Sequence, residues 1–413
     1  MANTFATQQK ITNAFLLLLK NELVMGKLVT TKFDKDFANE TVAVGDTVKL
    51  RRPPEFTVRD GKTASAQDVV VGTVDVTIDK QKGVDVNFTS KELTLEVDDL
   101  LKNQTMKAKA SQLAQQIDGD LMGETLEFSH WAGTPGQLVN SASDFFVGVQ
   151  KAMELAIPMD DLHAVLSPAD HFALAGSFTA LSASDSTVKT AIEKAKLPMV
   201  GGVQPYVSQN VKVLTVGTRA ATGATVINGA AQNVTYANAR TTYSQTLNVD
   251  GLTEGHTIKR GEVFTIADVY AVNPRSKETL SFLQKFVVLA DATANGSGEA
   301  ALTIASPIIT SGAYQTVSAA PADGAAVIWM GTASTAYNQN AIFHRGSIAL
   351  VGAKLEEPKS GVWSYATDAE TGLSLRTWSQ SDIANDEHMT RVDVLYGVAN
   401  IDRRLGLRLS GTA

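Results

Sequence analysis

The sequence lacks cysteine and is poor in histidine. Its 413 residues include no cysteine and six histidines. A chain without cysteine cannot form disulfide bonds, thiolate zinc sites or a cysteine nucleophile. The few histidines leave little choice for a catalytic base, and no two of them have the i,i+4 spacing of a metal site on a helix. The composition therefore predicts neither thiol chemistry nor a metal site.

The sequence also lacks a strong charge and a long apolar run. Its formal net charge is −7, which disfavours a general attraction to nucleic acid. The most apolar N-terminal run covers residues 14–19 and ends at Lys20, whereas a membrane-spanning helix needs about 20 apolar residues. No small-residue cleavage site follows this run. We therefore expect neither secretion nor a membrane partner.

Catalytic and nucleotide-binding motifs are missing as well. Residues 61–63 match the last three positions of a P-loop, but Phe56 stands where its first glycine would be. There is no GxGxxG motif after a predicted strand and no GxSxG elbow. We predict no catalytic residues, no cofactor and no enzymatic activity.

The first patterned segment is residues 1–40, which we interpret as an N-terminal arm. Its apolar residues recur at helical spacing. We expect this amphipathic helix to pack on a neighbouring subunit, and the alternative is an ordinary first helix of the same domain. The residues of the apolar face are Ile11, Phe15, Leu18, Leu19 and Leu23.

Residues 41–88 predict a long β-hairpin with a polar tip. Residues 69–79 and 84–88 alternate in polarity, and the pair Asp60-Gly61 is a strong turn signal. The hairpin is basic but carries no interleaved aromatic platform for nucleic acid. We therefore expect it to contact an acidic neighbouring subunit, and the alternative is a solvated charged hairpin. The contact candidates here are Lys49, Arg51, Arg52, Arg59 and Lys62.

The middle of the chain alternates between helix and strand. Residues 89–140 contain the longest helical candidate, a spine of about 35 residues and about 50 Å. Residues 141–218 predict an axial α/β domain. Within it, Ser141 and Ser167 are candidate helix caps, and each is followed three residues later by an aspartate.

Residues 219–338 change composition and predict an inserted all-β domain. Alanine, threonine, glycine, serine, asparagine and valine dominate, and turn pairs separate short strand-like pieces at the spacing of a sandwich or barrel. Residues 339–413 return to the axial and peripheral domains as strands. The turn pairs are Asp250-Gly251, Asn273-Pro274, Asn295-Gly296 and Asp323-Gly324.

The order of these parts resembles the tailed-bacteriophage major capsid proteins, in particular the short-tailed-phage type with an inserted β domain. The likeness spans nearly the whole chain and implies the α+β, HK-type fold of that family. Each of its motifs alone is a weak indication of the family, whereas their order along the chain is specific. They are residues 44–53 (VGDTVKLRRP), 167–170 (SPAD), 258–266 (IKRGEVFTI), 272–277 (VNPRSK), 340–343 (NAIF) and 395–398 (LYGV).

The resemblance implies a structural protein of the virion. Such proteins form hexamers and pentamers of an icosahedral head. They assemble in the cytoplasm of the host bacterium around a scaffolding protein, as a procapsid that expands while double-stranded DNA is packaged through a portal protein. The shell would enclose DNA without binding a specific sequence.

The inserted domain in this branch helps the subunit to fold and contacts neighbours across local twofold axes. The matching stretch here, about residues 229–245, carries one basic residue, Arg240, which is the sixth contact candidate. The alternative function is the shell of a cellular nanocompartment of the same fold, and the β insertion favours the phage.

Overall fold

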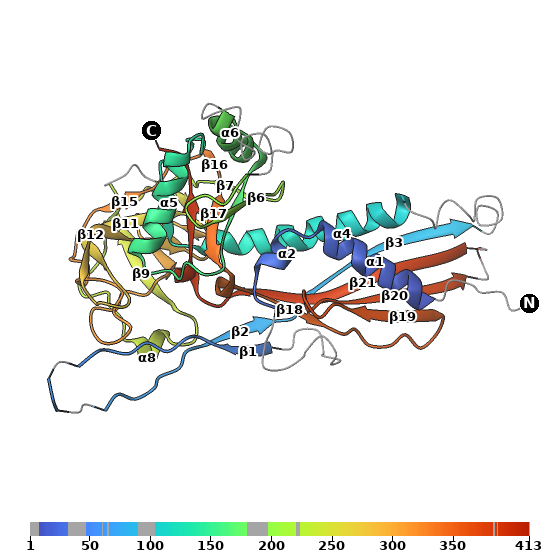
Figure 1. Cartoon of the computed structure of the whole chain (residues 1–413). Helices are drawn as coiled ribbons and strands as arrows, with labels where there is room; N and C mark the ends of the chain where they lie inside the picture. Colours follow the sequence, from blue (N-terminus) through green and yellow to red (C-terminus); the bar gives the residue numbers. More distant parts are fainter. Residues whose placement is uncertain are drawn as a thin grey trace, which may run out of the picture. The chain divides into compact units, whose positions relative to one another are not determined.

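The computed structural model describes residues 8–31, 47–59, 61–63, 66–89, 104–179, 197–219, 224–382, 385 and 387–412. The chain divides into two compact units, each built from segments that are far apart in the sequence (Figure 1). The first unit comprises Met1–Lys49, Asp75–Leu121 and Ile348–Ala399. The second unit comprises Leu50–Val74, Met122–Ser347 and Asn400–Ala413.

The first unit is a five-stranded sheet with helices. Strand β21 is the longest and pairs with β3, β18 and β20, and β19 pairs with β20. The helices are α1 (Gln8–Glu22), α2 (Met25–Leu28) and most of α4 (Gln104–Glu124). The strands are β3 (Lys80–Thr89), β18 (Ile348–Ala353), β19 (Val362–Thr367), β20 (Ser374–Asp382) and β21 (Glu387–Asn400).

The predicted hairpin is shorter than expected. Strands β1 (Thr47–Arg51) and β2 (Thr73–Thr77) pair with each other in a two-stranded sheet. The alternating residues 84–88 do not belong to this hairpin, because β3 pairs antiparallel with β21, with Val84 opposite Val392. Alternation of polarity identifies the buried face of a strand but not the strand beside it, and so this part of the prediction was wrong.

Helix α1 buries its apolar face within its own chain. Phe15, Leu19 and Leu23 are buried, and the helix packs on β19 and β20 (Figure 1). The hydroxyls of Thr12 and Ser364 lie 2.5 Å apart across this contact. The ordinary first helix, which was the alternative interpretation, therefore describes α1 better than a helix packed on a neighbour.

The turn between α1 and α2 is held by a carboxylate of α4. Asp118 is buried, and its two oxygens accept hydrogen bonds from the backbone N–H groups of Val24 (2.7 Å) and Gly26 (3.0 Å). Burial raises the pKa of Asp118 to about 6, and these hydrogen bonds oppose the rise. One side chain therefore attaches the end of the arm to the spine helix.

We expect Asp118→Ala to loosen the arm. The substitution leaves two buried N–H donors without an acceptor, which costs about 1–3 kcal/mol. Amide exchange over residues 8–28 should therefore accelerate about tenfold, as followed by mass spectrometry. The exposed Asp75 of the same unit provides the control Asp75→Ala, and equal exchange in both variants would contradict the role of Asp118.

The second unit contains a mixed five-stranded sheet with the order β4-β22-β17-β5-β6. Strand β17 is antiparallel to β22 and β5, whereas β22 is parallel to β4 and β5 is parallel to β6. The strands are β4 (His130–Ala132), β5 (Leu162–Leu166), β6 (Gln204–Val207), β17 (Asn340–His344) and β22 (Gly406–Leu409); β7 (Val213–Thr215) pairs with β16 (Ala336–Asn338). The unit also contains the helices α5 (Ala142–Glu154) and α6 (Pro168–Thr179) and the 3-10 turns η2 (Thr125–Glu127), η3 (Arg345–Ser347) and η4 (Arg403–Leu405).

Both predicted helix caps are present. The hydroxyl of Ser141 accepts a hydrogen bond from the N–H of Asp144 at the start of α5. The hydroxyl of Ser167 accepts one from Asp170 at the start of α6. A serine at this position satisfies an N–H group that has no partner within the helix, which is why these helix starts could be read from the sequence.

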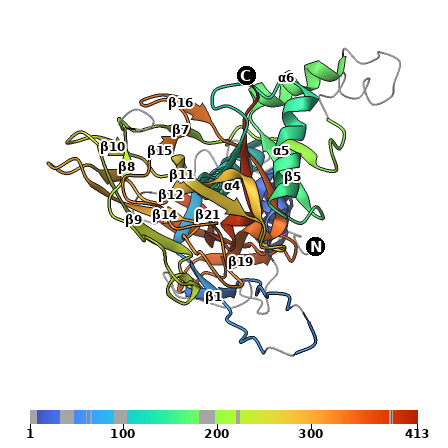
Figure 2. The ribbon, with the colours of Figure 1, turned by 90° about the vertical axis from the view of Figure 1, so that its left-hand side faces the viewer.

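The second unit also contains the predicted β-barrel. Its six strands are antiparallel in the order β15-β11-β12-β14-β9-β8 (Figure 2). Val226 of β8 bridges to Ala326 beside β15 and closes the barrel. The aromatic rings of Phe264, Phe286 and Trp329 fill its core. The strands are β8 (Val226–Ile227), β9 (Ser244–Asp250), β11 (Val263–Val272), β12 (Thr279–Val288), β14 (Ala300–Ala305) and β15 (Val327–Trp329), with β10 (Thr257–Ile258) paired to β13 (Ala292–Thr293) and a short helix α8 (Tyr236–Ala239).

A buried ion pair joins the two ends of the barrel segment. Nε of Arg219 lies 2.6 Å from a carboxylate oxygen of Glu262, and both side chains are almost fully buried. Arg219 also donates to the carbonyl of Gly331, and Glu262 accepts from the N–H of Gly217. The chain entering the barrel and the chain leaving it are therefore fastened to the same pair.

A second buried arginine connects β22 with the barrel. Arg408 has no exposed surface and donates to the carbonyl of Gly261 (2.6 Å), the side chain of Gln339 (3.0 Å) and the carbonyl of Leu126. Burial lowers the pKa of Arg408 to about 9. Its guanidinium group therefore bridges three segments that are distant in the sequence.

His130 is buried in β4 without a charge partner. In the described part of the chain its Nδ1 has no hydrogen-bond partner, and burial, together with nearby Lys285 and Lys151, lowers its pKa to about 3. The unfolded chain binds a proton at this residue near pH 6.5. The histidine therefore makes unfolding easier as the pH falls from about 6.5 towards 3.

We expect His130→Gln to reduce the acid sensitivity of the fold. In the original protein this histidine should remove about 2 kcal/mol of the free energy of unfolding between pH 7 and pH 5. Urea unfolding at both pH values measures the difference. His256→Gln, at a partly exposed histidine of the barrel segment, is the control. The same pH dependence with and without His130 would refute this expectation.

Candidate functional site

The candidate site is the extended loop, which we define as residues 52–72 between β1 and β2. In Figure 1 the chain leaves β1, runs past α8 and returns to β2. On β1, Lys49 and Arg51 are exposed while Val48 and Leu50 are buried. The strand therefore presents two of the predicted basic residues on one accessible face.

Two further candidates lie on the loop. Arg59 and Lys62 are both exposed. The guanidinium group of Arg59 donates to the carbonyls of Gly61 and Thr63 (3.0 Å for Thr63). Arg59 therefore helps to shape the loop, whereas Lys62 has an exposed ammonium group.

The loop also exposes apolar side chains that the sequence analysis did not single out. Phe56 is 52% exposed, Val69 is 61% exposed and Val58 is 96% exposed. Exposed apolar side chains of this size can be buried against another protein. Val69 belongs to the alternating run 69–79, and Phe56 and Val58 lie two residues apart, so their spacing indicated a strand rather than an exposed loop. With the basic residues they make a surface suited to another protein.

Arg52 has a different environment from its neighbours. It is 4% exposed, and its guanidinium group donates to the carbonyls of Ile401 (2.9 Å) and Arg240 (3.1 Å) and lies over the ring of Tyr243. Burial lowers the pKa of Arg52. These partners are within the subunit, and the contact of Arg52 to a neighbour stays a prediction.

Arg240 contributes its backbone rather than its side chain to this contact. Its carbonyl accepts the hydrogen bond from Arg52, and its side chain is exposed at the end of α8. The structure thus brings two of the six candidates together, through an interaction that the sequence did not reveal. A role between subunits remains a prediction for all six candidates, Lys49, Arg51, Arg52, Arg59, Lys62 and Arg240.

An acidic residue of the loop is fixed by two cations. The carboxylate of Glu55 binds Nη1 of Arg404 through one oxygen and Nζ of Lys277 (3.1 Å) through the other. Arg404 also forms two hydrogen bonds with the carboxylate of Asp402 and lies over Tyr243. Burial opposes the charges of Arg404 and Asp402, but their attraction prevails, raising the pKa of Arg404 and lowering that of Asp402. Arg404 and Asp402 therefore both stay charged at neutral pH.

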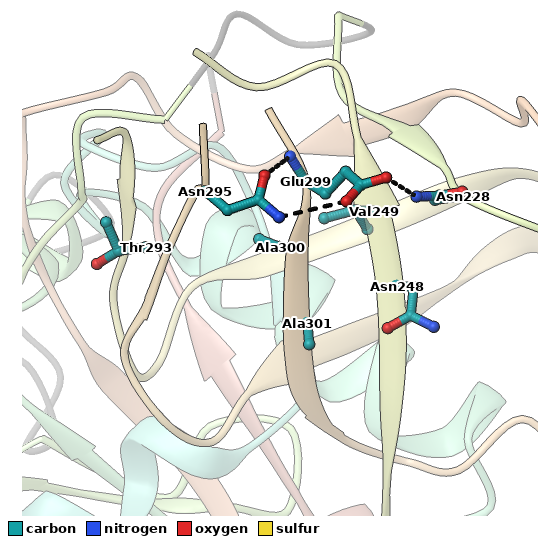
Figure 3. Close-up of a pocket in the computed structure, with 8 residues that line it drawn as sticks. All are labelled: Asn228, Asn248, Val249, Thr293, Asn295, Glu299, Ala300 and Ala301. Atoms are coloured by element: carbon teal, nitrogen blue, oxygen red, sulfur yellow. Dashed lines mark hydrogen bonds between the residues drawn. The ribbon is translucent and has the colours of Figure 1, made fainter. Parts of the chain in front are cut away.

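The barrel has a polar pocket of about 430 Å³ on its surface (Figure 3). Amide, carboxylate and small side chains line it. The carboxylate of Glu299 accepts hydrogen bonds from Asn228 (3.1 Å) and Asn295 (3.2 Å). These bonds connect neighbouring strands and turns, so the carboxylate supports the barrel rather than forming a catalytic set.

Within the ranges given above, no three acidic or histidine side chains come close enough together to bind a metal ion. The same part of the chain contains no helix long and apolar enough to cross a membrane.

We expect Arg52→Met to destabilise the monomer. It leaves the carbonyls of Ile401 and Arg240 without their donor, at a cost of about 1–3 kcal/mol. The matched control is Arg51→Met, at the exposed neighbour, which should change the free energy of unfolding by less than about 0.5 kcal/mol. Urea titration of the unassembled protein measures both values. A small effect in both variants would show that the contacts of Arg52 are dispensable.

Three comparisons relate this chain to known proteins. The model of a family described as "P22 coat protein - gene protein 5" matches residues 1–411. A major capsid protein of Acyrthosiphon pisum secondary endosymbiont phage 1 is 23% identical over 439 residues, covering 100% of both chains. Among solved structures, one of Mycobacterium phage Che8 covers 94% of this chain and 90% of its own, with 12% identity and a TM-score of 0.47. A virus-like particle from Pyrococcus furiosus covers 97% and 98%, with 8% identity and a TM-score of 0.40.

Proposed function

Because this chain belongs to the P22 coat protein family, we propose that its extended loop joins neighbouring subunits of a phage head. The chain is a tailed-phage major capsid protein with a mixed α+β fold, and it is a structural protein of the virion rather than an enzyme. It acts as a homo-oligomer in a closed shell. The observation that supports the proposal is the family match over residues 1–411.

The proposed assembly route follows from the family. Hexamers and pentamers form around a scaffolding protein in the cytoplasm of the host bacterium and give a procapsid. The procapsid expands while double-stranded DNA enters through a portal protein. The net charge of −7 suits a wall that encloses DNA without holding it, because a strongly basic wall would bind the phosphate backbone.

The exposed side chains of the loop are suited to a weak contact that is repeated many times in a shell. Burying one apolar side chain such as Phe56 or Val58 yields about 1.5–3 kcal/mol, and about 4 kcal/mol corresponds to millimolar affinity. A single contact of this strength dissociates readily, which permits correction of misplaced subunits. Several contacts per subunit together hold the shell, because each later contact forms at a high effective concentration.

We expect the double variant Arg51→Glu with Lys62→Glu to impair assembly. Both residues are exposed, so charge reversal should leave the melting temperature of the monomer unchanged while it weakens each contact by on the order of 1 kcal/mol. Particles formed with scaffolding protein are counted by electron microscopy, and we expect about tenfold fewer.

The control is Arg275→Glu, at an exposed basic residue of the barrel outside the loop. Unchanged particle yield in the double variant would refute the contact between subunits. Original protein that stays monomeric at high concentration with scaffolding protein would refute the assembly route. Particles that carry an enzyme as cargo and no DNA would instead indicate a cellular compartment.

A further inference from the structure

Both arms of the extended loop meet at one hydroxyl group of the barrel segment. Oη of Tyr314 accepts a hydrogen bond from the N–H of Glu55 (3.2 Å) and donates one to the carbonyl of Val70 (2.7 Å). Glu55 lies on the outgoing arm and Val70 on the returning arm. Tyr314 itself is 8% exposed. One nearly buried side chain thus fixes the separation of the two arms.

A second tyrosine supports the first. The rings of Tyr236 and Tyr314 are parallel within 2°, with their centres 3.4 Å apart. The returning arm passes so close to this pair that a Cβ atom on Gly72 would lie 2.5 Å from Oη of Tyr236 and 2.7 Å from the carbonyl of Arg240. A glycine is therefore required at this position. The N–H of Arg52 donates to the carbonyl of Gly72 and completes the base of the loop.

The barrel also binds the loop through an ion pair, in addition to the contacts of these tyrosines. Lys277, which binds the carboxylate of Glu55, lies in the turn between β11 and β12. Its backbone has a positive φ of 60°, a conformation that is unfavourable for a lysine. Three barrel side chains, Tyr236, Lys277 and Tyr314, therefore converge on the loop from three separate segments.

We propose that the inserted barrel positions the extended loop, with Tyr314 and Lys277 as positioning residues that hold the loop base in one orientation before a neighbour arrives. This inference rests on the proposed function of the loop in joining subunits. A loop that is ordered beforehand loses less conformational freedom when it binds. The barrel thereby raises the affinity of a contact in which its own positioning residues take no part.

The test uses the full-length unassembled chain and the variants Tyr314→Phe and Lys277→Met. Phenylalanine keeps the stacked ring and removes only the hydroxyl, and methionine keeps the apolar stem of lysine. We expect amide exchange over residues 55–71 to accelerate about fivefold in each variant. Exchange in the barrel strands and the melting temperature should stay unchanged. Tyr270→Phe, at a barrel tyrosine that is 38% exposed, is the matched control.

Particle yield with scaffolding protein is then measured for the same variants. Faster loop exchange together with about fivefold lower yield supports positioning by the barrel. Unchanged loop exchange in both variants overturns the inference and leaves the proposed contact between subunits intact. Faster loop exchange with normal yield also overturns the inference, because the orientation of the loop would then not matter for assembly, whereas the charge-reversal variant tests the contact between subunits separately.

Discussion

Charged groups that leave water must find partners inside the subunit, and the second unit depends on this constraint. An unpaired buried charge is too costly to keep, so each one dictates which segments come together. Arg219 and Glu262 fasten the two ends of the barrel segment. Arg404 bridges Asp402 and Glu55. Glu262 and Glu55 lie far in the sequence from the arginines that bind them, so a discontinuous chain acquires fixed connections that apolar contacts alone would not specify.

The same constraint separates two kinds of basic residue in the extended loop and its strand. Strand alternation turns Arg51 to solvent and Arg52 to the interior. The guanidinium group of an exposed arginine stays hydrated and pays little desolvation free energy. It is therefore available to bind a neighbouring subunit. A buried arginine is already committed to carbonyls of its own chain. Adjacent residues of one type therefore perform different tasks, one in the fold of the subunit and one in its proposed contacts.

The sequence was informative wherever the signal was local. Turn pairs such as Asp250-Gly251 predicted the barrel, and Ser141 and Ser167 predicted helix starts, because a turn or cap depends on a few adjacent residues. Pairing partners were not predictable in this way. Nothing near Val84 indicates that it faces Val392. The contacts of the extended loop were even harder to predict from the sequence. Glu55 and Tyr314 form a hydrogen bond although they are 259 residues apart in the chain, and a single tyrosine belongs to no sequence pattern.

The contacts between the barrel and the extended loop also explain how a long insertion is compatible with assembly. A segment whose ends are held together, as Arg219 does here by binding Gly331, can be long at little entropic cost, because the cost of loop closure grows slowly with length. Once closed, the barrel has its own apolar core, and an element packed around a core can orient a loop that has none. A shell built from weak contacts needs loops that are ordered before they meet, since ordering them during binding would use the small free energy on which each contact depends. An insertion that orders its host's loop in advance therefore leaves more of this small free energy for the contact itself.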